Sequence, residues 1–140
     1  MSPDALPLPR VVVAAAVVEH EGRYLLTRRL QGVHLEGLWE FPGGKCERHE
    51  THGQCLEREM LEELGTAVDV LEEICSVAHA YPDRVVELHF YRCQVTGTPR
   101  PRLGQKMRWV ALADLARLEF PPADAKLIEM LGKKTDRPRS

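Results

Sequence analysis

Three glutamates lie within five residues near the middle of the chain: Glu59, Glu62 and Glu63. Their spacing of i, i+3 and i+4 places them side by side on one face of a helix, where like charges repel. Clustered carboxylates supply the oxygen ligands that Mg²⁺ or Mn²⁺ prefers, and Mg²⁺ commonly shares its coordination shell with substrate phosphates. The pattern therefore indicates a metal site, and a solvated glutamate-rich helix face is the alternative interpretation.

The residues that flank these glutamates predict the helix that carries them. Thr51 and Gln54 fit a capping box and Gly65 fits the left-handed residue after a helix, so a helix is expected over about 52–64. Its apolar residues recur at every fourth position: Leu56, Met60 and Leu64. The glutamates border this apolar stripe, so we expect them at the edge of the core, where partial burial raises the cost of their repulsion.

The segment before this helix, "WEFPGGK" at 39–45, contains a Gly-Gly loop but no P-loop, because GxxxxGK[ST] is absent. Together with the helix it matches the Nudix box, G-x5-E-x7-R-E-U-x-E-E-x-G-U, in which U is a bulky aliphatic residue. The matching residues are Gly44, Glu50, Arg58, Glu59, Met60, Glu62, Glu63 and Gly65. The box covers 44–66, and its last position departs mildly from the pattern because it is Thr66.

Further segments resemble the MutT branch of the Nudix hydrolases, in the family's order, over roughly residues 11–131. They are "TRR" (27–29), "LWEFPGGK" (38–45), "YPDR" (81–84), "LHFY" (88–91), "RWV" (108–110) and "FPPAD" (120–124). The resemblance implies an α/β fold, the Nudix α/β/α sandwich with a mixed β-sheet. One domain over 1–140 is expected, with an ordered core of about 10–132. The implied reaction hydrolyses a nucleoside diphosphate linked to another group, typically a (deoxy)nucleoside triphosphate, to monophosphate and pyrophosphate.

The resemblance also implies which residues hold the metal, Mg²⁺ or Mn²⁺, and which bind the substrate. The implied metal ligands are Gly43, Glu50, Glu59, Glu62 and Glu63, with Gly43 acting through its carbonyl and Glu50 more weakly. Catalysis is assigned to Glu59, to Glu62 as a ligand or as the base that activates water, and to Arg58, which orients the carboxylates. The residues expected around the base are Arg29, Phe41, Tyr81, Arg84 and Asp124, and Lys45 is expected to contact phosphate.

Asp124 in "FPPAD" bears on which base is bound. Many MutT-type enzymes that prefer an oxidised guanine carry asparagine there, and an amide can both donate and accept hydrogen bonds. An ionised aspartate only accepts, which suits the amino group of cytosine or the N1–H and amino edge of guanine. A protonated Asp124 restores the donor, and capping of the following helix is the alternative role. Cytosine nucleotides and 8-oxo-dGTP are both candidate substrates.

One position departs from the branch in a way that concerns catalysis. Where MutT-type chains often carry a glutamate that faces the metals, the stretch "RLGQ" (102–105) has Leu103, which can neither bind metal nor accept a proton. Either the box glutamates suffice or another carboxylate takes part. Glu87 is the nearest by sequence pattern, although a cross-strand ion pair is the alternative role for it.

Composition excludes several other classes of function. The net charge of −2 argues against binding of polymeric nucleic acid or an anionic membrane, which needs a positive field. The longest apolar run, Val11–Val18, has eight residues, and a membrane helix needs roughly 20. Because the first ten residues lack a basic signal region, we expect a cytoplasmic protein. The resemblance implies a small nucleotide as the substrate, and the sequence leaves a monomer and a homodimer both open. The alternatives are another nucleoside-diphosphate-linked substrate, an RNA 5′ end, or a nucleotide-binding domain without activity.

The cysteines and histidines give no second metal motif. None of the four cysteines forms a CxxC pair, so reduced, partly buried thiols are expected. The six histidines form no HExxH, so surface or core roles are expected for them.

The elements that must position the site follow from periodicity. Strands are expected over 11–18, 23–29, 85–95 and 107–112, with one or two more within 67–81. Residues 30–42 and 96–105 are expected to be loops. A short helix is expected within 111–118 and a terminal helix over 121–134, with prolines at its start.

Overall fold

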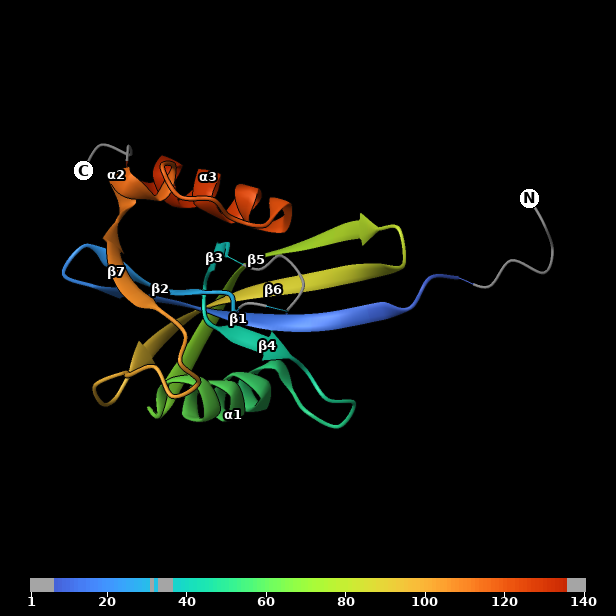
Figure 1. Ribbon diagram of the computed structural model, residues 1–140, viewed down its shortest axis with the longest axis horizontal. Coiled ribbons are helices and arrows are strands. Elements are labelled where there is room, and N and C mark those ends of the chain that lie inside the picture. Colours follow the sequence, from blue (N-terminus) through green and yellow to red (C-terminus); the bar gives the residue numbers. More distant parts are fainter. Residues whose placement is uncertain (1–6, 31, 33–36, 136–140) are drawn as a thin grey trace.

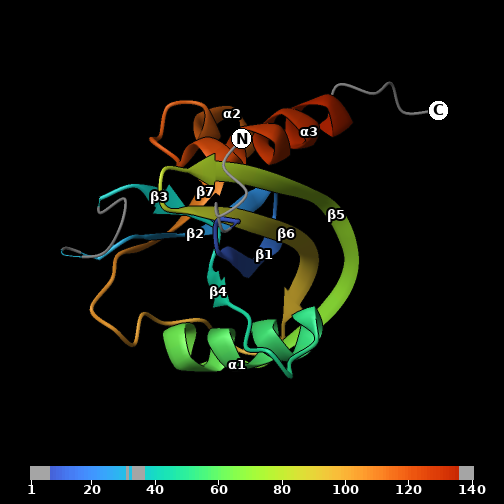
Figure 2. The same cartoon turned by 90° about the vertical axis from the view of Figure 1, so that its right-hand side faces the viewer.

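Helices cover both faces of a twisted mixed sheet in the computed structural model, which describes residues 7–30, 32 and 37–135 (Figure 1). The sheet follows the order β3-β2-β1-β6-β5, with β4 paired to β1 and β7 to β2. Helix α1 lies on one face, and α2 and α3 lie on the other, which Figure 2 shows from the side. This arrangement is the predicted α/β/α sandwich.

The centre of the sheet is the parallel pair of β1 (Arg10–His20) and β6 (Arg84–Val95). Residues 14–18 of β1 are buried, as the continuous apolar run predicts for a strand covered on both faces. A two-residue turn joins β1 to β2 (Arg23–Arg28). Both turn residues, Glu21 and Gly22, have positive φ, as a tight hairpin turn requires.

The segment 30–42, predicted to be a loop, contains one short strand in its described part, and a second short strand follows directly after it. Strand β3 (Trp39–Glu40) pairs with β2, and β4 (Gly43–Lys45) pairs with β1. Pairing with the neighbouring strands holds the residues of β3 and β4 in an extended conformation. Their own sequence is rich in glycine and proline and does not predict strands. Strand β5 (Val68–Tyr81) is a single strand with register shifts near Glu73, which resolves the open choice between one strand and two.

The helix that carries the glutamates is α1 (His52–Leu64). Thr51 and Gln54 form the predicted capping box, and Gly65 adopts the left-handed conformation at φ 63°. After β7 (Met107–Ala111) come α2 (Leu112–Leu115), the 3₁₀ turn η1 (Pro122–Asp124) and α3 (Ala125–Thr135). The predicted terminal helix therefore begins as a 3₁₀ turn.

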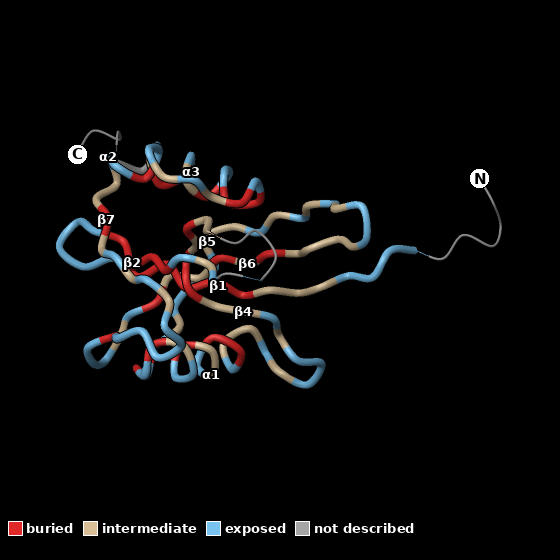
Figure 3. Tube along the Cα trace, viewed as in Figure 1, coloured by how far each residue is buried: buried red, intermediate tan, exposed pale blue. Residues whose placement is uncertain are grey.

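Two apolar cores fill the spaces between the layers. Figure 3 marks the buried residues, which occur in the sheet and in the helices on both of its faces. One packs α1 against the sheet through Leu56, Met60 and Leu64, which are all fully buried, as the stripe predicts. The other packs α3 against the opposite face around Phe90 and Leu127. All four cysteines are free and partly or fully buried, as predicted. No helix in the described part of the chain is long and apolar enough to cross a membrane.

Candidate active site

The glycines before α1 allow the helix carboxylates to lie against the backbone of β4. A Cβ added at Gly44 would lie 2.4 Å from the carboxyl carbon of Glu59. A Cβ added at Gly43 would lie 2.1 Å from the carbonyl oxygen of Ala14, and Gly43 also has φ 155°. No other residue fits either position without displacing its neighbours. The Gly-Gly pair is therefore required by the approach of Glu59 on one side and β1 on the other.

Arg58 compensates most of the carboxylates around it. Its Nε and Nη2 lie 2.6 and 2.7 Å from the two carboxylate oxygens of Glu50, a bidentate pair. Its Nη1 lies 2.9 Å from Glu59 and 3.4 Å from Glu62. The hydrogen bonds from Arg58, with one from the Glu47 N–H, lower the pKa of Glu50 to about 2. Arg58 thus holds these side chains in one orientation.

Glu63, in contrast, forms no ion pair with Arg58. The backbone N–H of Gly43 donates to its Oε2 at 3.2 Å, and no cation among the described residues pairs with it. Burial, followed by repulsion from Glu59 and Glu40, raises the pKa of Glu63 to about 8 against the opposing effect of the Gly43 N–H. Burial also raises the pKa of Glu59, although Arg58 opposes it. The Glu63 carboxylate is therefore not paired with a cation among the described residues.

These residues fit a divalent cation. Within the described ranges, no group of three or more histidine, cysteine, aspartate or glutamate side chains is already arranged around an ion position. Mg²⁺ does not need such a cage, because it is usually held by one or two carboxylates, water and substrate phosphates. Glu59 and Glu63 repel each other beside the Gly43 backbone, so they would be suited to supply these carboxylates, and the added charge would relieve their repulsion.

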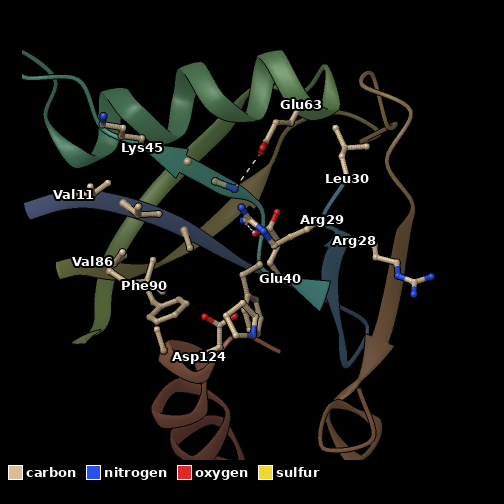
Figure 4. Close-up of a pocket in the computed structure, with 18 of the residues that line it drawn as sticks. Val11, Arg28, Arg29, Leu30, Glu40, Lys45, Glu63, Val86, Phe90 and Asp124 are labelled. Carbon is tan, nitrogen blue, oxygen red and sulfur yellow. Dashed lines mark hydrogen bonds and ion pairs between the residues drawn. The ribbon is translucent and has the colours of Figure 1, made fainter. Parts of the chain in front are cut away.

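A cavity of about 420 Å³ connects Glu63 with the far side of the sheet, which we call the central cavity (Figure 4). It runs from α1 past β4 and β1 to the η1 turn, where Asp124 lies. All of the residues predicted to bind substrate line it: Arg29, Phe41, Lys45, Tyr81, Arg84 and Asp124. Of the predicted metal ligands, Gly43 and Glu63 line it, whereas Glu50, Glu59 and Glu62 do not.

The sequence did not single out Glu40, which lines the middle of the cavity. Its Oε2 accepts from Nη1 of Arg29 at 2.7 Å, and burial raises its pKa although Arg29 opposes the shift. The same carboxylate raises the pKa of Glu63 at one end and of Asp124 at the other. No pattern marks this role, because Glu40 reaches the cavity only through the pairing of β3 with β2.

The predicted base-binding residues differ in how freely they reach the cavity. Phe41 is only 3% exposed and packs between Phe90, at 6.0 Å between ring centroids, and Phe120, at 5.8 Å. It therefore forms part of the core as well as the cavity wall. Arg84 Nε, in contrast, is a fully buried nitrogen without a hydrogen-bond partner among the described residues. Its nearest acidic neighbour, Asp83, lies 3.9 Å away.

Asp124 is 4% exposed and does not cap α3 within the described structure. Its backbone N–H donates to the Pro121 carbonyl, and its carboxylate has no hydrogen bond or ion pair to another described residue. Burial, followed by repulsion from Glu40, raises the pKa of Asp124 to about 7, against the effect of Arg29. Both the ionised and the protonated forms are therefore populated near neutral pH.

Leu103 and Glu87 occupy different surroundings. Leu103 lines the central cavity and is 54% exposed. Glu87 lies outside the lining and pairs with Arg10 at 3.3 Å and with His89 at 2.9 Å, which confirms the cross-strand ion pair. His89 in turn packs against the tilted ring of His52, at 4.2 Å between ring centroids, so both histidines contact other side chains of the protein.

The sequence and fold are similar to proteins of known name. The family model described as NUDIX domain matches residues 13–130. An 8-oxo-dGTP diphosphatase of Haemophilus influenzae is 38% identical over 127 residues, which cover 89% of this chain and 93% of the relative. A CTP pyrophosphohydrolase of Escherichia coli is 34% identical over 120 residues, covering 85% and 89%. The solution structure of the E. coli ORF135 protein matches with a TM-score of 0.82 and 32% identity, covering 95% of this chain and 96% of that one.

Proposed function

The chain belongs to the Nudix family and is a Nudix hydrolase, and from this premise we propose that it cleaves (deoxy)nucleoside triphosphates to nucleoside monophosphate and pyrophosphate. Hydrolases of this family generally need a divalent metal, which we assign here as Mg²⁺ or Mn²⁺. The observation that carries the proposal is the central cavity, which joins the uncompensated carboxylate of Glu63 to the buried carboxylate of Asp124. One end suits a metal-bound polyphosphate, and the other suits a base.

At the phosphate end, the chain's own groups hold charge in fixed positions. We assign the metal to Glu59, Glu63 and the Gly43 carbonyl, with Arg58 keeping Glu59 and Glu50 oriented. The cation, when bound, neutralises phosphate charge and lowers the pKa of bound water. Lys45 lines the cavity and would contact phosphate.

Glu62 does not line the cavity itself, but it precedes Glu63 on α1 and remains available beside the phosphate end. Its side chain is 58% exposed and is held only by a 3.4 Å contact to Arg58. It is therefore free to complete the metal site or to accept a proton from water. Leu103 supplies no carboxylate at the cavity wall, so the proposed chemistry rests on the glutamates of α1.

At the base end, Asp124 and Arg84 supply the polar contacts. An ionised Asp124 accepts from an exocyclic amino group, and a protonated one also donates. Arg84 Nε is a buried donor without a partner, which a base carbonyl would satisfy. Cytosine and oxidised guanine each present an amino group and a carbonyl. We therefore propose that CTP-type nucleotides and 8-oxo-dGTP are both substrates, as the names of the two relatives suggest.

A panel of nucleotides incubated with Mg²⁺ tests this proposal, with pyrophosphate release as the readout. We expect turnover of cytosine triphosphates and 8-oxo-dGTP that EDTA abolishes and added Mg²⁺ restores. A nucleoside diphosphate sugar and a capped RNA serve as the competing substrate classes. Turnover of either of these in place of every triphosphate, or no turnover at all, would contradict the proposal.

A further inference from the structure

The loop between β6 and β7 closes the carboxyl end of α1. Its backbone N–H groups at Arg100 and Arg102 donate to the carbonyls of Leu64 and Glu63, both at 2.9 Å. The Arg102 side chain covers Gly65 so closely that an added Cβ would lie 2.9 Å from its Cδ. The last carbonyls of a helix have no partner within the helix, and this loop supplies the donors. The same loop lines the central cavity through Leu103 and Gln105.

Gln105 connects this loop to the backbone of Glu63 with both ends of its amide. Its Nε2 donates to the Glu63 carbonyl at 2.9 Å, and its Oε1 accepts from the Leu103 N–H at 2.9 Å. Only a side chain with a donor and an acceptor on one planar group satisfies both partners. Gln105 is partly buried and itself lines the cavity, so the bridge lies beside the reacting end.

We propose that Gln105 is a positioning residue that fixes the last turn of α1, and with it the carboxylate of Glu63, for divalent metal binding; the inference rests on the proposed role of Glu63. The penultimate residue of a helix lies where helices fray. Glu63 is also pushed by the charges of Glu59 and Glu40. The Glu63 carbonyl, held by Gln105 Nε2 and the Arg102 N–H, keeps that turn in place against this repulsion.

The test uses Gln105→Met, which keeps the length of the side chain and removes both hydrogen bonds. Mn²⁺ binding to the full chain is measured by electron paramagnetic resonance without nucleotide. We expect Kd for Mn²⁺ to rise roughly 10-fold, as is usual when a group that orients a ligand is removed. The Mg²⁺ concentration for half-maximal activity should rise in parallel, while KM for the nucleotide stays within about 3-fold.

Two further variants separate positioning from a general loss of stability. Arg100→Ala alters an exposed side chain of the same loop and keeps its backbone contact, so Mn²⁺ affinity should be unchanged. Gln105→Asn keeps the amide but is one methylene too short to span both partners. It should reproduce the methionine variant, and it replaces that variant if the methionine chain does not fold.

A double variant tests the coupling directly. In a Glu63→Gln background, Gln105→Met should leave the Mn²⁺ affinity unchanged, because the residue it positions no longer binds metal. An unchanged Kd for Mn²⁺ in the single Gln105 variants, with a lowered melting temperature, would overturn the proposal. A wild type that binds Mn²⁺ but hydrolyses no nucleotide would instead contradict the proposed function and leave the binding test intact.

Discussion

Two groups of carboxylates in this molecule differ in how their charge is compensated. The central cavity holds Glu63 and Asp124, and neither forms an ion pair with a described residue. A second group, which we call the histidine cluster, lies at the amino end of α1. It consists of Arg10, His52, Glu73, Glu87, His89 and Tyr91.

In the histidine cluster every carboxylate has a donor. His89 donates from one ring nitrogen to Glu73 at 2.8 Å and from the other to Glu87 at 2.9 Å when it is protonated. Hydrogen bonds from His89 and Arg10 lower the pKa of Glu87. Desolvation acts to lower the pKa of His89, but its bonds to Glu73 and Glu87 outweigh that and raise it. Both carboxylates of the cluster are therefore paired with donors that carry positive charge.

The cavity shows the opposite pattern, because burial and mutual repulsion raise the pKa of Glu63 to about 8 and of Asp124 to about 7. Folding alone gives no reason to take two such carboxylates partly or fully out of water without a cation to pair with them. Perturbed carboxylates that lie in a cavity are characteristic of sites where a ligand completes the interactions. The histidine cluster and the candidate site therefore differ in whether their carboxylates are paired with positive charge. The number of acidic residues does not distinguish them.

Replacing one carboxylate in each region should give the largest difference between the two regions, measured as the change in kcat. We expect Glu63→Gln, and likewise Glu59→Gln, to lower kcat by more than about 100-fold, because each removes a proposed metal ligand. Glu87→Gln should keep kcat within about 3-fold. Steady-state turnover and melting temperature are measured together, and Glu63→Gln should melt no lower than wild type since it removes buried repulsion. Near-normal turnover of the Glu63 variant would remove the functional distinction between the two regions.

A second exchange sharpens the comparison at the base end of the cavity. Asp124→Asn should shift the ratio of kcat/KM for 8-oxo-dGTP to that for CTP upward by roughly 10-fold or more, because a hydrogen bond to a charged group contributes about 1.5–3 kcal/mol. The wild-type ratio should fall between pH 6 and pH 8 as Asp124 ionises, with its pKa of about 7. The asparagine variant should lose this pH dependence. A ratio that is the same in both proteins would show that Asp124 does not contact the base.

Stability should fall as pH rises in both regions, but substitution should have opposite effects: loss of His89 destabilises the fold, whereas loss of the Asp124 charge stabilises it. The raised pKa of His89 means that its stabilisation is present below about pH 6.5 and is lost as pH rises through its folded value. His89→Gln should therefore lower the free energy of unfolding by about 1–2 kcal/mol at pH 6, allowing for the partial exposure of Glu73, and by less at pH 9.

Asp124 shows the same pH dependence but the opposite effect of substitution. Its raised pKa means that the ionised form is disfavoured in the fold, so stability is lost as pH rises from about 4 to 7. Asp124→Asn should therefore be more stable than wild type at pH 8 and similar to it near pH 4. Denaturant unfolding at three pH values measures both variants. A His89→Gln variant as stable as wild type at pH 6, or an Asp124→Asn variant less stable than wild type at pH 8, would break the comparison.

The smallest expected effect is stabilisation by the metal itself. At ten times its Kd, Mg²⁺ should add about 1.4 kcal/mol to the free energy of unfolding of the wild type. Glu87→Gln should respond in the same way, because its carboxylate is already paired. The double variant Glu59→Gln/Glu63→Gln should not respond. Thermal unfolding with and without Mg²⁺ measures this, and a response of the double variant would place the ion elsewhere.

The sequence by itself determined the elements whose signals are local. The capping residues Thr51 and Gln54, the stripe of Leu56 and its partners, and Gly65 lie within one helix and its ends, so their spacing predicts α1 closely. The Nudix box lies in the same stretch and gives the family and the general chemistry. Residues expected around the base were also found to line one cavity, because their order along the chain follows that of the family.

Only the tertiary structure decided which charges are compensated. Glu40 reaches the cavity through the pairing of β3 with β2, and it perturbs Glu63 and Asp124, which lie 23 and 84 residues further along the chain. Gln105 meets the Glu63 carbonyl across 42 residues, and His89 meets Glu73 across 16. The physical reason is that a pKa and a hydrogen bond depend on burial and on distances between atoms, and the folded sheet sets these for residues that are far apart in sequence.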